Sequence, residues 1–215
     1  MRALLVWLAL TSSAQAQEFI DAEHALNDED FYRLVACAAP PMDACQKQIV
    51  KWDKADLSVG ITKMDRAYLG GKAKRAQAAL ARAIQEVNSA GSAINLRRDD
   101  KNPDIEILFL DIPRGGEIRG SGFTRLEGTP ISAAGVRVFV SESSILKAVI
   151  IFTPALQIRA YESAMLEEIT QGLGFLTDIG GTFYETRSIF SQSSNALTKL
   201  GKQDIMALGQ HYPAR

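Results

Sequence analysis

The sequence feature that most constrains the fold is the order of hydrophobic periodicities along residues 51–215. Apolar residues at helical spacing predict a long helix over residues 72–90 and a second over residues 157–175. Short apolar runs between the two helices predict four strands, at residues 93–96, 105–110, 136–140 and 148–152. An extended segment is expected around residues 52–61, and a last helix from about Thr198. This order predicts an α/β (α+β) domain in which a mixed, twisted sheet of about five strands packs against two long helices and a C-terminal helix.

The first sixteen residues have the pattern of a secretory signal peptide. Arg2 precedes an apolar run over residues 3–10, and Ala14-Gln15-Ala16 supplies the small residues of a cleavage site. The apolar run is shorter than the roughly 20 residues that cross a bilayer. We therefore expect a signal peptide over residues 1–16 and a mature protein that is periplasmic or secreted.

The charge balance gives no sign of a strongly charged partner. The chain has 24 Lys and Arg residues against 25 Asp and Glu residues, and removal of Arg2 with the signal peptide leaves 23 against 25. A nearly neutral chain has no electrostatic footprint for nucleic acid or for an anionic membrane. No later segment has the apolar length of a membrane span. We expect no nucleic-acid partner and no transmembrane segment after signal cleavage.

Residues 17–50 are expected to form an N-terminal extension ahead of the main domain over residues 51–215. The sequence Asn27-Asp28-Glu29-Asp30 predicts the start of a short helix, which Pro40-Pro41 would end. A second short helix is the expected continuation, over residues 42–49.

Cys37 and Cys45 are the only two cysteines in the chain. In an oxidising compartment, a pair this close predicts a disulfide that staples the extension. The alternative, a two-cysteine metal site, lacks partners because the only histidines, His24 and His211, lie at opposite ends of the sequence. We expect His211 instead to be favoured as a cation by the dipole of the last helix.

The pattern most informative about function is the segment E-E-I-T-Q-G-L-G-F, which begins at Glu167. Glu167 and Gln171 lie four residues apart and are expected on one face of a helix, opposite an apolar stripe with Met165 and Ile169. Gly174 is expected to permit a sharp turn at the helix end. The predicted helix is therefore apolar on one side and rich in side-chain oxygens on the other.

This segment resembles the active-site helix of the metzincin zinc proteases, H-E-x-x-H-x-x-G-x-x-H. In that motif the histidines bind zinc, the glutamate is the general base and the glycine turns the chain. The positions of the three histidines are taken by other residues, namely Glu167, Gln171 and Thr177. Glu168 takes the position of the glutamate and Gly174 that of the glycine, and Asp178 comes one residue after the third ligand position. The resemblance implies a zincin-like fold with a catalytic position at Glu168 and binding positions at the other polar residues.

The resemblance continues downstream. Ser188-Ile189-Phe190 resembles the Ser-Ile-Met turn that lies beneath the metal in metzincins, and residues 197–212 resemble the closing helix of the matrix-protease group. The chain is more closely similar to a group of secreted bacterial proteins known as a domain of unknown function, with the signature E-E-L-T-Q-x-L-G-L-x-x-D, then S-I-F, then L-T-x-x-D. This family brings no established activity. Structural roles are expected for Gly174, Ser188, Ile189, Phe190, Cys37 and Cys45.

The side chains at the former ligand positions do not suit zinc, which prefers imidazole and thiolate. Calcium is more compatible with the oxygens of Glu167, Gln171 and Asp178, but calcium sites gather about six or more oxygens. We therefore predict no bound metal or other cofactor, with zinc disfavoured and calcium compatible.

Three functions stay open from the sequence. The leading expectation is a non-catalytic, degenerate protease-like protein that binds a peptide or a cell-envelope component along the edge of the sheet. The second is a peptidase or glycan hydrolase centred on Glu168, which would need a distant second carboxylate such as Asp178 or Glu185 because adjacent helical residues point about 100° apart. The third is a structural component of an envelope assembly. In the simplest structural interpretation, the acids form a polar patch that hydrogen-bonds the loop beneath the helix.

Overall fold

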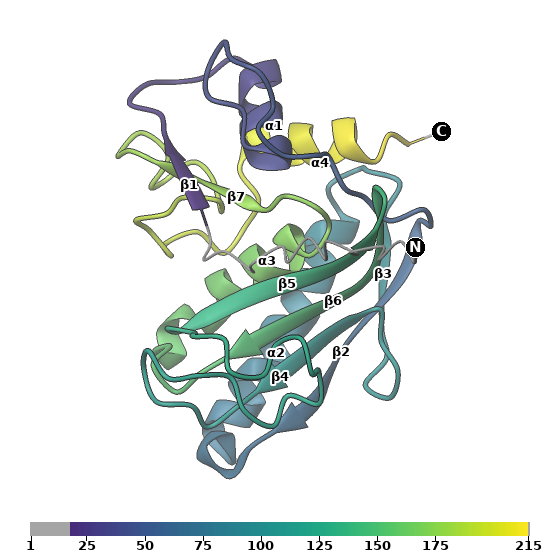
Figure 1. Ribbon diagram of the computed structural model, residues 1–215, viewed down its shortest axis with the longest axis vertical. Coiled ribbons are helices and arrows are strands. Elements are labelled where there is room, and N and C mark those ends of the chain that lie inside the picture. The colour runs from purple at the N-terminus through teal and green to yellow at the C-terminus, as the bar shows by residue number, and fades with distance from the viewer. Residues whose placement is uncertain (1–17, 215) are drawn as a thin grey trace, which may run out of the picture.

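The chain folds around a five-stranded mixed sheet. The computed structural model describes residues 18–214, so the predicted signal peptide lies outside the described residues. The strands of this sheet are β2 (Asp56–Met64), β3 (Asn95–Arg98), β4 (Ile105–Phe109), β5 (Ala134–Ser141) and β6 (Ser144–Phe152). Their order is β3-β2-β4-β6-β5, with β5 antiparallel to β6 at one edge and all other neighbours parallel (Figure 1). The predicted mixed α/β architecture with five strands is confirmed.

Two helices pack together on one face of the sheet. Helix α2 (Gly71–Asn88) contributes Leu80 to the main hydrophobic core, and helix α3 (Tyr161–Gln171) contributes Met165 and Ile169. Two short 3₁₀ turns precede these helices, η1 (Arg66–Tyr68) and η2 (Ile158–Ala160). In Figure 1, α3 runs alongside the edge strand β5, and the two elements are in contact.

The opposite face of the sheet is covered by the chain between β4 and β5. Leu108 and Val149 project from the sheet into a second, smaller core, where they pack with Ile118 and Leu126 of that connection. Because both faces are covered, β4 and β6 are nearly continuous apolar runs and do not alternate. This explains why short apolar runs in the sequence predicted these strands.

The N-terminal and C-terminal segments form a second layer above the large sheet in Figure 1. Strand β1 (Glu18–Asp21) pairs in parallel with β7 (Thr177–Gly180), and helix α1 (Asp28–Cys37) packs against α4 (Lys202–His211). Phe31 of α1 is fully buried and contacts the ring of Tyr184. The predicted extension is thus packed into the same hydrophobic core as the C-terminal segment.

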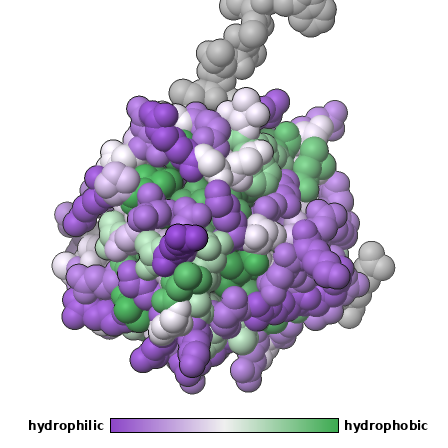
Figure 2. Space-filling view, turned by 90° about the horizontal axis from the view of Figure 1, so that it is seen from below, coloured by the Kyte–Doolittle hydropathy of each residue, from purple (hydrophilic) through white to green (hydrophobic). Residues whose placement is uncertain are grey.

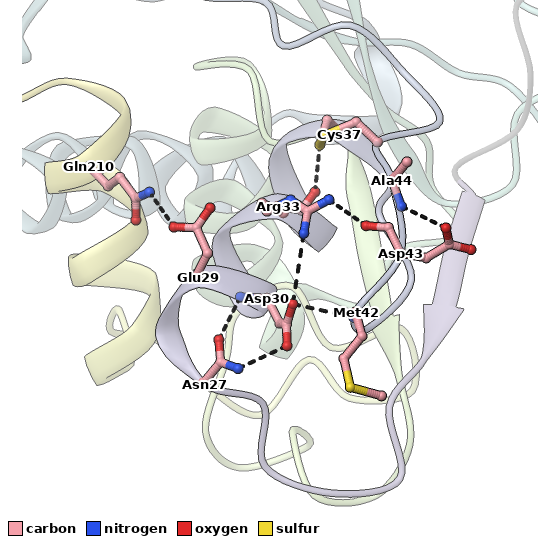
Figure 3. Close-up of polar contacts among 10 residues, drawn as sticks. Asn27, Glu29, Asp30, Arg33, Cys37, Met42, Asp43, Ala44 and Gln210 are labelled. Carbon is pink, nitrogen blue, oxygen red and sulfur yellow. Dashed lines mark hydrogen bonds and ion pairs between the residues drawn. A yellow bond between two sulfur atoms is a disulfide. The ribbon is translucent and has the colours of Figure 1, made fainter.

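Helix α1 begins at the capping residue expected from the sequence. The side-chain oxygen of Asn27 accepts the backbone N–H of Asp30 at 2.8 Å. In the same first turn of the helix, the Glu29 carboxylate accepts the Gln210 amide of α4 at 3.0 Å (Figure 3). These contacts fix the start of α1 and join it to the last helix.

The disulfide between Cys37 and Cys45 is present, with the two Cα atoms 5.2 Å apart. The expected helix over residues 42–49 is wrong, since this segment is a loop of turns and bends. Met42 has a left-handed backbone with φ of 63°, and the amides of Gln46 and Lys47 donate to the Cys37 carbonyl. The disulfide and these amide bonds hold the segment against the end of α1, so its amides are not available for helical bonds. Arg33 also donates to the Asp43 carbonyl in this loop (Figure 3).

Other boundaries also differ from the prediction. Strand β3 covers residues 95–98 and not 93–96, β6 begins at Ser144, and α4 (Lys202–His211) begins after Thr198. Helix α3 ends at Gln171 and begins only at Tyr161, so it is shorter than the predicted helix over residues 157–175. Strand β7 lies in the segment that was expected to be irregular. Its partner β1 is at the other end of the described chain. Because this pairing is so distant in sequence, the four residues of β7 carry no local pattern that predicts a strand.

The surface carries mainly hydrophilic side chains. On the face seen from below in Figure 1, hydrophobic side chains form small groups within a hydrophilic surface (Figure 2). Within residues 18–214, the helices fall short of the length and apolar character needed to cross a membrane.

Candidate functional site

The polar residues of the predicted motif meet where α3 ends and β7 begins. The Gln171 amide nitrogen donates to the Asp178 carboxylate at 2.7 Å. Gln171 is 0% exposed, and Glu168 and Asp178 are each 3% exposed. Glu167 is partly buried, one residue before Glu168 on the same helix. The structure therefore brings four of the predicted site residues together, but inside the protein and not on an open oxygen-rich face.

The sharp turn between α3 and β7 depends on Gly174. Its φ is 116°, a conformation that residues with a side chain rarely adopt. A Cβ atom at this position would lie 2.2 Å from the Val50 carbonyl oxygen and 2.9 Å from the His211 ring. Only glycine allows the chain to pass this close, and the turn it makes returns Asp178 to the end of α3.

The three carboxyl groups oppose one another's ionisation. Burial raises the pKa of Glu168 to about 8, and the negative charge of Asp178 adds to the shift. Burial also raises the pKa of Asp178 to about 7, against the opposing effect of its hydrogen bond from Gln171. The pKa of Glu167 is raised for the same reason, first by loss of water and then by its two acidic neighbours. At neutral pH the cluster therefore holds protons that ordinary carboxylates would have lost.

Arg137 on β5 is the cation that faces this cluster, and the sequence analysis missed it. Its positive charge lowers the pKa of Glu168 against the larger effect of burial. The guanidinium donates to the Val136 carbonyl at 2.8 Å. Within residues 18–214, the Arg137 Nε–H and the Glu168 Oε2 atom are both buried without a hydrogen-bond partner. The Arg137 Nε–H is thus a positively charged donor and Glu168 Oε2 an acceptor, and neither atom has a hydrogen-bond partner among the described residues.

The position of Arg137 relative to the sheet follows from the pairing of β5 with β6. The Thr153 amide donates to the Ala133 carbonyl, which fixes the hydrogen-bonded positions of the β5–β6 pair. Because these positions alternate along an antiparallel pair, the backbone groups of Ala134, Val136 and Val138 point away from β6. The Arg137 guanidinium on the Val136 carbonyl therefore lies at this outer edge.

Thr177 and the Ser188-Ile189-Phe190 turn are buried, and neither meets the acidic cluster through a hydrogen bond among described residues. The turn is instead held by Asp204 of α4. The Asp204 carboxylate accepts the Ser188 hydroxyl at 2.6 Å, the Ile189 amide at 3.0 Å and the Gly201 amide at 2.7 Å. Burial raises the pKa of Asp204, and these three donors act against that shift. The polar patch on α3 therefore contacts the following segment through the Gln171–Asp178 bond, while the Ser188 turn is held by Asp204.

The expected cationic role of His211 is also wrong. His211 is 1% exposed, and burial lowers its pKa to about 4. Because the Val50 carbonyl can only accept, the ring nitrogen Nε2 must donate to it at 3.1 Å, and Nδ1 then accepts the Tyr32 hydroxyl at 3.1 Å. The side chain is a neutral link between α4, α1 and the segment before β2.

The residues at the former metal-ligand positions do not fit zinc. The Gln171 amide already donates to Asp178, and the remaining groups are carboxyls and a hydroxyl. Among residues 18–214, His, Cys, Asp and Glu side chains form no group of three or more that could hold a metal ion. We derive no step through a metal at this site.

The class defined by these features is a mixed α/β protein with a buried acidic cluster beside an open sheet edge. Searches against models of protein families and against curated proteins found no match for this sequence. The relationship to metzincins and to the secreted bacterial family stays a prediction from the motif.

Proposed function

We propose that this protein is an exported, non-catalytic, zincin-like protein that binds an extended peptide segment along the free edge of β5. The observation that carries the proposal is the edge position of β5, which pairs with β6 on one side only. The buried atoms Arg137 Nε and Glu168 Oε2, which have no hydrogen-bond partner among residues 18–214, support it. Buried polar atoms without partners are rare in folded proteins, and a ligand is one way to satisfy them.

Strand addition gives such a ligand its main-chain bonds. The outward N–H groups of Ala134, Val136 and Val138, with the C=O groups of Ala134 and Val138, are spaced to pair with alternate residues of an added strand. The Val136 carbonyl becomes available when the Arg137 guanidinium turns away from it. The same movement of Arg137 would open the buried atoms to the ligand. A peptide carbonyl can then accept the Arg137 Nε–H, and a peptide amide or carbonyl can pair with the Glu168 carboxyl in its ionised or protonated form. Recognition of this kind requires no chemical step.

The predicted signal peptide and the disulfide support export. A disulfide persists in an oxidising compartment, and Cys37 and Cys45 are joined in the folded protein. The ligand would therefore be a peptide segment of a protein or an envelope component in the periplasm or outside the cell.

A peptide library tests the proposal. Oxidised residues 17–215 would be screened against acetylated, amidated octapeptides, and the retained peptides would be measured by fluorescence anisotropy. Val138→Pro removes one outward N–H while the neighbouring bonds to β6 stay in place, so we expect at least a tenfold loss of affinity. Val138→Thr is the matched control, because it keeps the N–H and the branched shape, and it should bind like the wild type.

A second measurement does not depend on the fold of the variant. Retained peptides would be resynthesised with N-methyl groups on alternate amides, in the two possible registers. One register should abolish binding to the wild-type protein and the other should not, because only alternate amides of an added strand face β5. Retention of no peptide, or equal loss in both registers, would contradict strand addition.

The second candidate function is a hydrolase that uses Glu168 as a proton donor. The raised pKa of about 8 favours this candidate, since a carboxyl group that is protonated at neutral pH can act as a general acid. Glu168→Gln separates the two functions: it would abolish turnover in a hydrolase, whereas a binding protein would keep its peptide affinity within a few fold. A structural component of an envelope assembly would instead co-purify with its partner.

A further inference from the structure

A cavity of about 550 Å³ lies at the start of α3, away from the acidic cluster. Its walls come from the turn before α3 and from residues 193–196, and Arg114 closes one side.

The charges of the lining favour an anion. Arg114 and Arg159 are the only charged residues that line the cavity. Both side chains are exposed, and among residues 18–214 neither guanidinium has an ion pair or hydrogen bond. Uncharged polar groups complete the wall, from Gln157, Ser193 and Asn195. Arginine pairs with carboxylates through two parallel hydrogen bonds, so two free arginines at one cavity suit a carboxylate ligand.

The cavity lies at the end of the molecule where β5 begins. The amide of Gly115, next to Arg114, donates to the Ile131 carbonyl at 3.1 Å. On the other side, the Thr153 amide donates to the Ala133 carbonyl at 2.8 Å, directly before β5. A peptide strand that pairs antiparallel to β5 would therefore bring its C-terminal end to this cavity.

We infer that the peptide bound at β5 runs antiparallel to the strand and places a carboxylate of its C-terminal end between Arg114 and Arg159. This inference rests on the proposed function and adds its direction and its chemical preference. The carboxylate comes from an acidic side chain or from a free chain terminus, and both present the same group to the arginines.

The test uses paired peptides. Every octapeptide of the library would be made in four forms: Gln-amide at the end, Glu-amide at the end, Gln with a free carboxylate, and Glu moved to the first position with Gln-amide at the end. We expect the form that ends in Glu-amide and the form that ends in Gln with a free carboxylate to bind about tenfold more tightly than the Gln-amide form, because each adds one charge-assisted pair. The larger gain of the two identifies the source of the carboxylate.

A double variant assigns the preference to the cavity. Arg114→Gln with Arg159→Gln should remove the gain and leave the affinity for the Gln-amide form unchanged. The matched control is Arg97→Gln with Arg98→Gln on β3, at the opposite edge of the sheet, which changes the net charge equally and should keep the gain.

The outcomes separate this inference from the proposed function. Equal binding of the first three forms would overturn the carboxylate site while peptide binding stands. Tighter binding of the form with Glu at its first position would overturn the antiparallel direction. Binding of no form would refute the proposed function and this inference with it.

Discussion

Substitution of Glu168 by Gln should make the protein more stable at neutral and alkaline pH, by an amount that increases as pH rises toward 8. The Glu168 pKa is raised from 4.5 to about 8 in the folded protein. A carboxyl whose folded pKa is raised stabilises the fold below its unfolded pKa, and this contribution is lost as pH rises through the folded pKa. Each pH unit in that window changes the free energy of unfolding by about 1.4 kcal/mol. Between pH 6.5 and 8 the wild type should therefore lose about 1.5 kcal/mol relative to Glu168→Gln, since Glu168 is half ionised at the upper limit.

Urea unfolding at pH 6.5, 7.25 and 8 measures this difference. Trp52 is the only tryptophan after the predicted signal peptide, and its Nε1–H donates to the Gly172 carbonyl at the end of α3 at 2.9 Å, so its fluorescence reports on this region. Glu162→Gln is the matched control, because Glu162 lies on the same helix but pairs with Arg82 at the surface. Its effect should be small and equal at the three pH values. If Glu168→Gln follows the wild type across the range, Glu168 is already ionised in the folded protein and the argument from burial is refuted.

Three further predictions concern stability. Gly174→Ala should lower the free energy of unfolding in urea by about 3 kcal/mol, because the alanine Cβ would clash with the Val50 carbonyl. A loss under about 1 kcal/mol would contradict the close contact between Gly174 and Val50. The lowered pKa of His211 contributes stability above pH 6.5 that is lost as pH falls toward 4. Over this window the free energy of unfolding of the wild type should therefore fall by about 3 kcal/mol relative to that of His211→Gln, measured in parallel acid titrations. Replacement of Cys37 and Cys45 by Ser should lower stability by about 2.5 kcal/mol, as expected for a short loop, and reductant should then have no effect on the double variant.

Much of the fold follows from local patterns in the sequence. Helix α2 and strands β4 to β6 were predictable because each is long or apolar enough to carry its own periodicity. Strand β3 has one apolar residue and was predicted two residues too early. Strand β7 was not, since its four residues are defined by pairing with β1, more than 150 residues earlier. The loop over residues 42–49 was mistaken for a helix because its conformation is set by the disulfide and by the Cys37 carbonyl.

The candidate site was predictable only where its residues are close in sequence. Glu167, Glu168 and Gln171 share one helix, and Asp178 follows after one turn of chain. Arg137 comes from a strand 31 positions before Glu168, and nothing in the run Gly135–Val140 distinguishes it from an ordinary surface arginine. The burial that raises the carboxyl pKa values is likewise a property of the packed helix, which the spacing of its polar residues does not show.

Two buried acids in this protein differ in a way that separates structural from functional roles. Asp204 is 1% exposed, and its carboxylate receives three hydrogen bonds that hold the Ser188 turn to α4. Glu168 is 3% exposed, yet its Oε2 atom has no partner among the described residues, and a like charge lies nearby. Burial of an acid without a partner opposes folding, so a purely structural role would have been served better by a neutral or apolar side chain. Under the proposed function, Glu168 completes its hydrogen bonds only when a ligand lies along β5, whereas Asp204 completes its own within the fold.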